Sequence, residues 1–284
     1  MQRQRLRRIS WQRHVNPSSP DNDMKDFIAV MDSGVGGISV LIPMHRLMPD
    51  ENFLFYGDSA NAPYGTKSTD MVRSRVLELV ADFLDEGAKA IAIACNTATS
   101  AAVKDLREIY PEVPIVGIEP ALKPAVTEHE GGRILVMATP MTIREEKFKN
   151  LLSRYGGDCE VIPLPCPGLM EYVEGGKADT DEVEAFLREL LSPYLSGGLD
   201  AVVLGCTHYP FIRKRLQRVI GSDVEIYDGS LGTAKELRRR ISDAGLLRPS
   251  GAGEGTICFR NSDKSEEKQK LSEELFYSHR EHCH

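Results

Sequence analysis

Two stretches of this chain decide how it folds: AIAIACNTATS at residues 90–100 and AVVLGCTHYP at residues 201–210. In each, a short apolar run ends at a cysteine, Cys95 or Cys206, and polar residues follow. Each pattern predicts a buried β-strand with a thiol at its carboxyl end, where a helix begins. Ligands of open α/β sheets bind at that edge, and a helix N-terminus favours thiolate over thiol. One thiol in each half of the chain therefore suggests chemistry on both faces of one small substrate.

Strand-like apolar runs alternate with helical patterns along nearly the whole chain. Apolar residues recur at steps of three and four, as in helices, at 72–83, 103–110, 183–191, 211–220, 234–247 and 264–276. The predicted strands lack polar–apolar alternation, so we expect a mostly parallel sheet arrangement, buried by helices on both faces. These strands span residues 27–31, 53–56, 90–94, 114–117, 134–138, 161–164, 201–204, 224–227 and 256–259.

A weak internal repeat indicates two related halves. The segment IAVMDS at 28–33 resembles ILVMAT at 134–139, and each precedes its cysteine by a similar interval. We therefore expect two α/β domains that face each other across a cleft. The first would comprise residues 25–118 plus 229–284, and the second residues 119–228.

Residues 1–24 form a separate, arginine-rich segment. It has no apolar core of a secretory signal, so we expect a disordered extension, with Met24 as a candidate natural start. The composition is that of a soluble globular protein, with 41% hydrophobic residues among 284 and a net charge of −7. This balance argues against nucleic acid as the main partner, and no apolar stretch is long enough to span a membrane.

Cysteine usage indicates a reducing, cytoplasmic setting. The six cysteines include no C-x-x-C pair, which argues against a disulfide framework. Cys95 with Cys206 and His208, and the terminal His282-Cys283-His284, lack a recognised zinc spacing, so we expect no metal. The remaining cysteines, Cys159, Cys166 and Cys258, are interpreted as packing residues.

Two polar loops follow predicted strands. DSGVGG at 32–37 allows a tight turn and close backbone approach to an anionic group, but its glycine spacing is not that of a dinucleotide site. Asp32 would stand ionised at the mouth of the cleft. GDSANAPYGTKS at 57–68 is not a P-loop, and it suits a compact polar ligand. His208, two residues after Cys206, can tune or relay the proton of that thiol.

Taken in order, five blocks resemble the aspartate/glutamate racemase family. They are DSGVGG, GDSANAPYGTKS, ACNTATS at 94–100, VGIEPALKPA at 116–125 and VLGCTHYP at 203–210. The resemblance covers about residues 27–276 and implies two similar parallel-sheet α/β domains related by pseudo-twofold symmetry, with the active site between them. It also implies cofactor-independent interconversion of L- and D-glutamate, which supplies D-glutamate for bacterial peptidoglycan.

The same resemblance implies roles for individual residues. Cys95 and Cys206 would be the two acid/base groups on opposite faces of the substrate Cα, acting on the D- and L-isomer respectively. Asp32 would assist Cys95, whereas His208 and Glu174 would assist Cys206. The ammonium and carboxylate groups of the substrate would be held by Asp32, Ser33, Pro63, Tyr64, Gly65, Asn96, Thr97, Thr207 and His208.

Three alternatives remain open at this point. An aspartate racemase of the same family is the nearest, although His208 after the second Cys-Thr favours glutamate. A cysteine hydrolase using Cys206 and His208 leaves Cys95 unexplained. A non-catalytic amino-acid-binding protein would need neither thiol. We expect a homodimer or a monomer–dimer equilibrium, a small-molecule substrate, and no resident cofactor.

Overall fold

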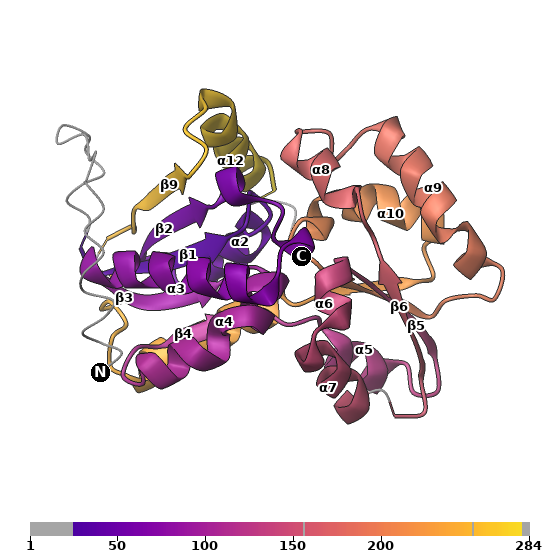
Figure 1. The fold of residues 1–284 in the computed structure, drawn as a ribbon, viewed down its shortest axis with the longest axis horizontal. Helices are drawn as coiled ribbons and strands as arrows, with labels where there is room; N and C mark the ends of the chain where they lie inside the picture. The colour runs from indigo at the N-terminus through magenta and orange to yellow at the C-terminus, as the bar shows by residue number, and fades with distance from the viewer. Residues whose placement is uncertain (1–24, 156, 252, 280–284) are drawn as a thin grey trace.

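The computed structural model describes residues 25–279 except 156 and 252, and it shows two lobes, each built on a parallel sheet (Figure 1). The first sheet has strand order β4-β3-β1-β2-β9, and the second has β6-β5-β7-β8. The predicted strands are all present, with bounds within two residues of those expected: β1 (Phe27–Asp32), β2 (Asn52–Gly57), β3 (Ala88–Ile93), β4 (Ile115–Gly117), β5 (Arg133–Ala138), β6 (Glu160–Pro165), β7 (Ala201–Gly205), β8 (Glu225–Asp228) and β9 (Ile257–Asn261). The arginine-rich extension, Met24 and the terminal His-Cys-His run lie outside the described residues.

The two sheets share one topology. In the first, β1 lies between β3 and β2, with β4 beyond β3; in the second, β5 lies between β7 and β6, with β8 beyond β7. The internal repeat therefore corresponds to the central strand of each sheet, and β9 is an addition to the first. The prediction of two similar parallel-sheet domains is confirmed. Strands of the first sheet come from 27–117 and 257–261, and those of the second from 133–228; the domain boundaries near 118 and 229 stay a prediction.

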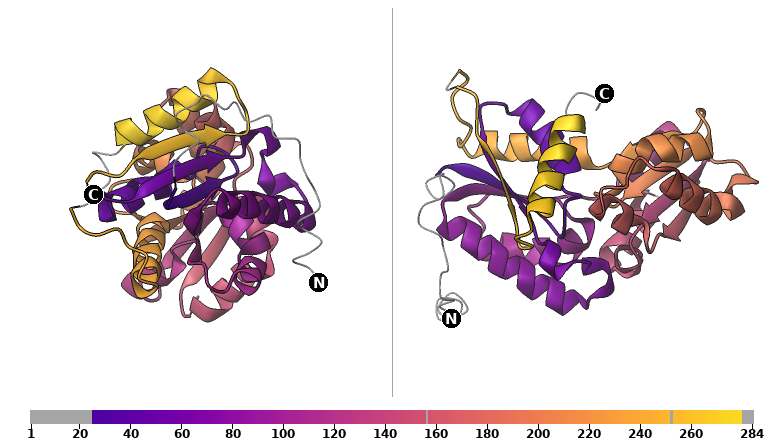
Figure 2. Two further views of the ribbon diagram at one scale, coloured as in Figure 1. Left: turned by 90° about the vertical axis from the view of Figure 1, so that its left-hand side faces the viewer. Right: turned by 90° about the horizontal axis from the view of Figure 1, so that it is seen from above.

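Helices cover both faces of each sheet, as Figures 1 and 2 show. In the first lobe α2, α11 and α12 pack on one face and α3 and α4 on the other. In the second, α8, α9 and α10 cover one face and α5 and α7 the other. The helices are α2 (Ile38–Leu47), α3 (Thr69–Asp85), α4 (Asn96–Ile109), α5 (Leu122–Glu128), α6 (Pro140–Arg144), α7 (Glu146–Tyr155), α8 (Leu169–Glu174), α9 (Asp181–Leu195), α10 (Arg213–Ile220), α11 (Ser230–Asp243) and α12 (Glu266–His279), with short 3₁₀ helices η2 (Ser59–Asn61), η3 (Tyr64–Thr66) and η4 (Tyr209–Ile212).

Burial on both faces explains why the strands show no alternation. In β1, Ile28 and Val30 join the core under α2, while Ala29 and Met31 join the core under α3 and α4, and all four are fully buried. The core on the α2 side is continuous with the core under α8 to α10 in the second lobe. The two lobes are therefore joined by apolar packing as well as by the chain.

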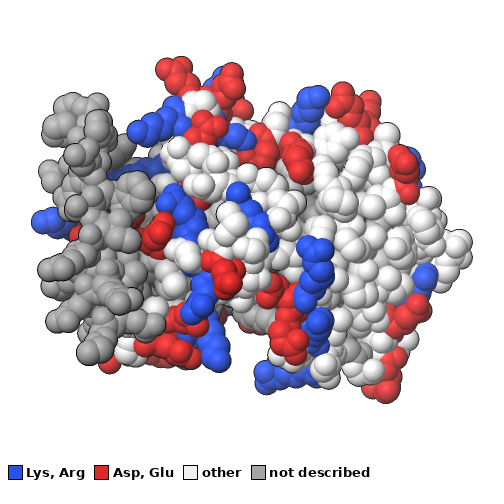
Figure 3. Space-filling view, in the orientation of Figure 1, with Lys and Arg blue, Asp and Glu red and all other residues white. Residues whose placement is uncertain are grey.

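Several helices were not predicted, and α2 shows the reason. Residues Ile38–His45 are all buried, so α2 has no polar face and no helical period to detect, and Pro43 interrupts its sequence pattern. Within residues 25–279, no helix combines the length and apolar character needed to cross a bilayer. On the face drawn in Figure 3, acidic and basic side chains are intermingled rather than gathered by sign.

Candidate active site

Cys95 caps the N-terminus of α4 at the carboxyl end of β3. The backbone N–H of Ala98 donates to Cys95 Sγ at 3.4 Å, and the thiol donates to the Ser33 hydroxyl at 3.7 Å. The side chain is buried, and it meets the first amides of the helix, where negative charge is favoured. The predicted strand–cysteine–helix arrangement is confirmed for Cys95.

Cys206 follows β7, but no α-helix begins there, so that part of the prediction is wrong. The Tyr209 N–H donates to the Cys206 carbonyl at 3.1 Å, and η4 then separates the cysteine from α10. Pro210 lies in the first turn of η4, where a helix needs no backbone N–H from it. The neighbouring polar group at Cys206 is an imidazole, whereas at Cys95 it is an amide at a helix N-terminus. His208 Nδ1 lies 3.7 Å from Cys206 Sγ.

The two thiols face one narrow cavity between the lobes. Its free volume of about 10 Å³ has room for about one water molecule. Six of the nine predicted substrate-holding residues line it, whereas Asp32, Pro63 and Tyr64 do not. Glu174, predicted to assist Cys206, does not line it either. The lining residues are Ser33, Gly65, Cys95, Asn96, Thr97, Thr139, Met170, Gly205, Cys206, Thr207 and His208.

Next to Cys206, a series of hydrogen-bonded charged groups extends from the second lobe to the first: His208, Glu174 and Lys268. His208 Nε2 lies 2.7 Å from Glu174 Oε1, and the same oxygen accepts the Val35 N–H at 2.7 Å. Lys268 on α12 donates to the Glu174 main-chain carbonyl at 2.8 Å and also to its carboxylate. His208 is 1% exposed, so its contact with Glu174 is shielded from solvent. Although Glu174 is the last residue of α8, its carboxylate is bonded to protein groups and is only 14% exposed.

These contacts determine the protonation states of Glu174 and His208. Burial alone would raise the pKa of Glu174, but its bonds with His208, Lys268 and Val35 lower the pKa to about 2. Burial would lower the pKa of His208, yet hydrogen bonds with Cys206 and Glu174 raise the pKa well above 6.5. An imidazolium–carboxylate pair beside Cys206 results.

The surroundings of Cys95 favour its neutral form, whereas those of Glu174 and His208 favour their charged forms. Burial, and secondarily the nearby Asp32 carboxylate, raise the pKa of Cys95 to about 12, although its hydrogen bonds with the Ala98 amide and the Ser33 hydroxyl oppose the rise. Burial likewise raises the pKa of Asp32, against the influence of His208 and the Gly34 amide. Cys95 is therefore a neutral thiol at neutral pH.

The DSGVGG loop brings the first lobe against the acid/base groups of the second. Asp32 accepts hydrogen bonds from the Gly34 and Gly37 amides at 3.1 Å each, and from the Thr207 hydroxyl at 3.3 Å. A Cβ on Gly34 would lie 1.9 Å from Glu174 Oε1, and one on Gly36 would lie 2.3 Å from His208 Nδ1. The glycines thus make room for a histidine and a carboxylate of this same chain, rather than for the backbone approach to an anionic ligand considered from the sequence.

Within the second polar loop, Gly65 reaches the cavity and Tyr64 turns away from it. The Tyr64 hydroxyl donates to Asp58 Oδ2 at 2.7 Å, and Arg75 on α3 holds the Asp58 carboxylate with contacts of 2.9 and 3.0 Å. Pro63, half-buried, precedes this anchored tyrosine. Tyr64 and Asp58 therefore fix the loop that places Gly65 opposite Thr139, whose Cβ would lie 3.1 Å from a Cβ on Gly65.

Several cavity and site residues were missed from the sequence. Thr139 lines the cavity, and its hydroxyl lies 3.2 Å from that of Thr97, so the lobes meet through two threonines. Thr139 occupies the position of Ser33 in the internal repeat, a signal that could have identified it. Met170 and Lys268 follow no motif, and no comparable signal marked them.

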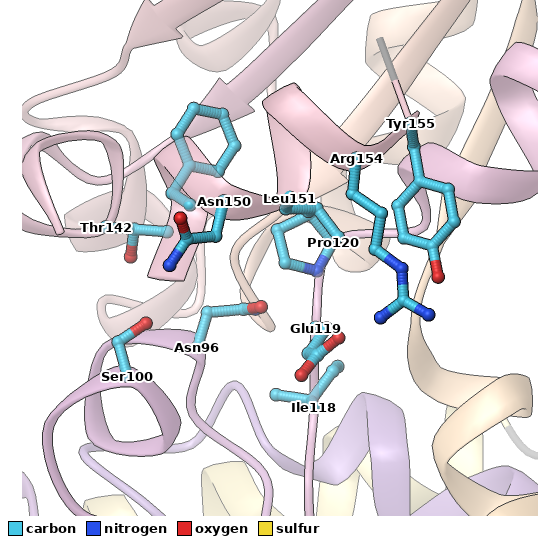
Figure 4. A pocket seen from close by; sticks show the side chains of 11 residues that line it. Asn96, Ser100, Ile118, Glu119, Pro120, Thr142, Asn150, Leu151, Arg154 and Tyr155 are labelled. Carbon is cyan, nitrogen blue, oxygen red and sulfur yellow. The ribbon is translucent and has the colours of Figure 1, made fainter. Parts of the chain in front are cut away.

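Asn96 carries unused hydrogen-bonding capacity in the site. Its side chain is 5% exposed, and within the described part of the chain neither its amide nitrogen nor its oxygen has a partner. Asn96 lines both the narrow cavity and a larger neighbouring cavity of about 190 Å³, where Ser100, Glu119 and Arg154 also lie (Figure 4). A buried amide of this kind is suited to a polar ligand. No cluster of three metal-binding side chains occurs among residues 25–279 that the structure describes.

The fold and the paired thiols place the chain among two-lobed α/β racemases. It belongs to the Asp/Glu/Hydantoin racemase family, whose model matches residues 36–237. The chain is 48% identical over 255 residues to a glutamate racemase of Clostridium perfringens, a match covering 89% of this chain and 98% of that protein. The crystal structure of Thermus thermophilus glutamate racemase with β-chloro-D-alanine is similar (TM-score 0.75, 35% identity, 89% of this chain and 94% of that one). So is Escherichia coli glutamate racemase with L-glutamate and the activator UDP-MurNAc-Ala (TM-score 0.78, 26% identity, 90% and 95%). The family resemblance read from the motifs is confirmed.

Proposed function

We propose that this protein interconverts L- and D-glutamate by proton transfer at Cα between two cysteines, without a cofactor, and so supplies D-glutamate for peptidoglycan. The observation that carries the proposal is the single cavity faced by Cys95 from one lobe and Cys206 from the other. A single base tends to return its proton to the same face, whereas two opposed groups invert the centre. The names of the similar racemases support glutamate as the substrate.

In the direction from L to D, Cys206 acts as the base. Its thiolate, next to the His208 imidazolium, removes the Cα proton and becomes a thiol. The Cys95 thiol then donates its proton to the opposite face of the carbanion and becomes a thiolate. The raised pKa of Cys95, about 12, keeps this group protonated before substrate arrives, as a donor requires. From D to L the roles reverse.

The charged groups of glutamate would be held largely by neutral donors. No lysine or arginine is among the residues lining the narrow cavity, so hydroxyls, the Asn96 amide and the first amides of α4 would receive the carboxylates. Asp32 would lie near the ammonium group. Because the cavity has room for about one water molecule, the lobes must separate to admit substrate and close around it.

Oligomeric state and location complete the proposal. We propose a homodimer or a monomer–dimer equilibrium in the cytoplasm, acting on a free small molecule. Light scattering of the purified protein at several concentrations measures the first of these. A mass that stays that of one chain at all concentrations contradicts it.

A deuterium experiment tests the function. The purified protein is incubated with L-glutamate in D₂O without added cofactor, and the product is analysed by chiral chromatography and mass spectrometry. We expect D-glutamate carrying one deuterium at Cα. A parallel incubation with L-aspartate tests the aspartate alternative, and a covalent acyl adduct on Cys206 would identify a hydrolase. Glutamate binding without turnover or exchange would identify a binding protein and end the proposal.

A further inference from the structure

Lys268 connects the C-terminal helix to the acid/base groups of the other lobe. It lies on α12, which packs on α2 and β9 of the first lobe, whereas Glu174 ends α8 in the second. The Lys268 ammonium donates to the main-chain carbonyl of Glu174 at 2.8 Å and to its carboxylate. Their side chains are 20% and 14% exposed, so this ion pair is partly shielded from solvent.

Glu174 is held from both lobes at once. Val35 and Lys268 of the first lobe donate to it, and His208 of its own lobe lies 2.7 Å from Oε1. Separation of the lobes would remove the first two partners and leave only the third. The carboxylate that orients His208 is therefore fully held only when the lobes are closed.

We propose that Lys268 is a positioning residue which, on closure of the lobes, fixes Glu174 against His208 and so prepares Cys206 for proton transfer. This inference rests on the proposed racemase activity. Lys268 lines neither of the two cavities and has no contact with the thiols; it acts through Glu174. It holds both the backbone and the side chain of the residue that ends α8, directly before Gly175 and Gly176, which have no side chains of their own to restrain the backbone.

Positioning and simple charge predict opposite changes in the His208 pKa. The titratable groups facing His208 are Cys206 beside it, Glu174 from α8, Asp32 from β1 and, through Glu174, Lys268 from α12. If Lys268 acted only as a nearby positive charge, its removal would raise the pKa of His208. If it holds Glu174 in place, its removal weakens the Glu174–His208 bond and lowers the pKa of His208.

The test compares Lys268→Met with Lys268→Arg and a matched control. Lys270, two residues along α12, is 78% exposed and pairs with Glu274, so Lys270→Met removes the same charge without touching Glu174. We expect Lys268→Met to lower kcat/KM by about tenfold or more, equally in both directions because the enantiomers are equal in energy. Lys268→Arg should recover most of the activity, and Lys270→Met should match the wild type.

A second readout does not depend on turnover. The imidazole of His208 is titrated by NMR in the full chain labelled at histidine, with His208→Gln used to assign its signal. We expect the His208 pKa to fall by about one pH unit in Lys268→Met and to stay unchanged in Lys270→Met. The alkaline limb of the pH profile of kcat/KM should move to lower pH in the same variant.

A double-mutant comparison separates positioning from a general loss of structure. In the background of Glu174→Gln, Lys268→Met should cause less than about a twofold further change in kcat/KM. An undiminished effect in that background, a raised or unchanged His208 pKa, or wild-type activity in Lys268→Met overturns the inference. If the wild type itself does not racemise glutamate, the proposed function fails instead, and the titration still decides what Lys268 does to His208.

Discussion

The two thiols stand at matching places in two sheets of the same topology, yet their surroundings differ. Cys95 is contacted by the Ala98 amide and the Ser33 hydroxyl, both from its own lobe. Cys206 lies beside His208, and the carboxylate that binds His208 is held by Val35 and Lys268 of the opposite lobe. The shared scaffold therefore fixes where each sulfur stands, while the loops decide how its proton is held.

This difference gives the two halves different dependence on closure. The hydrogen bonds of Cys95 with Ala98 and Ser33 lie within its own lobe and persist whether or not the lobes meet, and in the closed structure burial keeps the thiol protonated. Full support of His208 requires the first lobe to contact Glu174. We infer that Cys95 is held as a proton donor and that Cys206 becomes an effective base when the lobes close.

The largest expected effect comes from removing either sulfur. Cys95→Ser and Cys206→Ser should each lower kcat/KM by about 10³-fold or more, because an alkoxide is far harder to form than a thiolate. Racemisation followed by polarimetry measures the loss in both directions. Cys166→Ser is the matched control: Cys166 is buried but lines neither cavity, and its thiol donates to the Leu164 carbonyl at 3.3 Å, as a serine hydroxyl can. Retained turnover in either active-site variant would contradict the symmetrical use of the two thiols.

The next largest loss of activity should come from a change at Gly36, which contacts His208 beside Cys206. A Cβ on Gly36 would lie 2.3 Å from His208 Nδ1, and the imidazole is too deeply buried to move aside freely. We expect Gly36→Ala to lower kcat/KM by about 10²-fold and to displace the His208 NMR signal. Gly232→Ala in α11, where a Cβ meets nothing within 4 Å, is the control and should leave activity intact. An active Gly36→Ala variant with an unshifted His208 signal would show that the loop does not position this ring.

Sequence reasoning succeeded where a pattern is local. The apolar runs that end at Cys95 and Cys206 gave the strands, and the repeat around residues 28–33 and 134–139 gave the two similar sheets. It failed for α2, since a helix buried on every side shows no helical period. It also failed at Cys206, where Pro210 and the η4 turn replace the expected helix start.

The site was predicted where its residues lie in motifs at strand ends, and it was missed where a contact depends on how helices and loops pack. Asp32, Cys95 and His208 lie in motifs at strand ends, and the parallel topology brings those ends together. The contact of Lys268 with Glu174 joins residues 94 apart in two lobes, and only the packing of α12 determines it. Likewise, the need for glycine at positions 34 and 36 becomes clear only when Glu174 and His208 are seen against that loop.

The smallest effects are on stability, and they should separate the two halves by pH. The pKa of Glu174 is lowered to about 2, so its contribution is present above the ordinary carboxyl pKa and is lost as the pH falls toward 2. Because the pKa of His208 is raised, its share of the pair is complete below about pH 6.5 and declines at higher pH. Glu174→Gln should therefore lower the free energy of unfolding by on the order of 2 kcal/mol between about pH 4.5 and 6.5, with the difference vanishing near pH 2.

Cys95 should show the opposite behaviour on the alkaline side. Its pKa is raised to about 12, so the folded state favours the neutral thiol, and this contribution is complete below the ordinary thiol pKa and declines above it. Relative to Cys95→Ala, the wild type should lose about 1 kcal/mol of unfolding free energy by about pH 9.5. Urea unfolding of wild type, Cys95→Ala and Glu174→Gln across the pH range measures both effects. If the difference in unfolding free energy between the wild type and a variant does not change with pH, the pKa of that residue is not shifted in the folded state as its contacts predict.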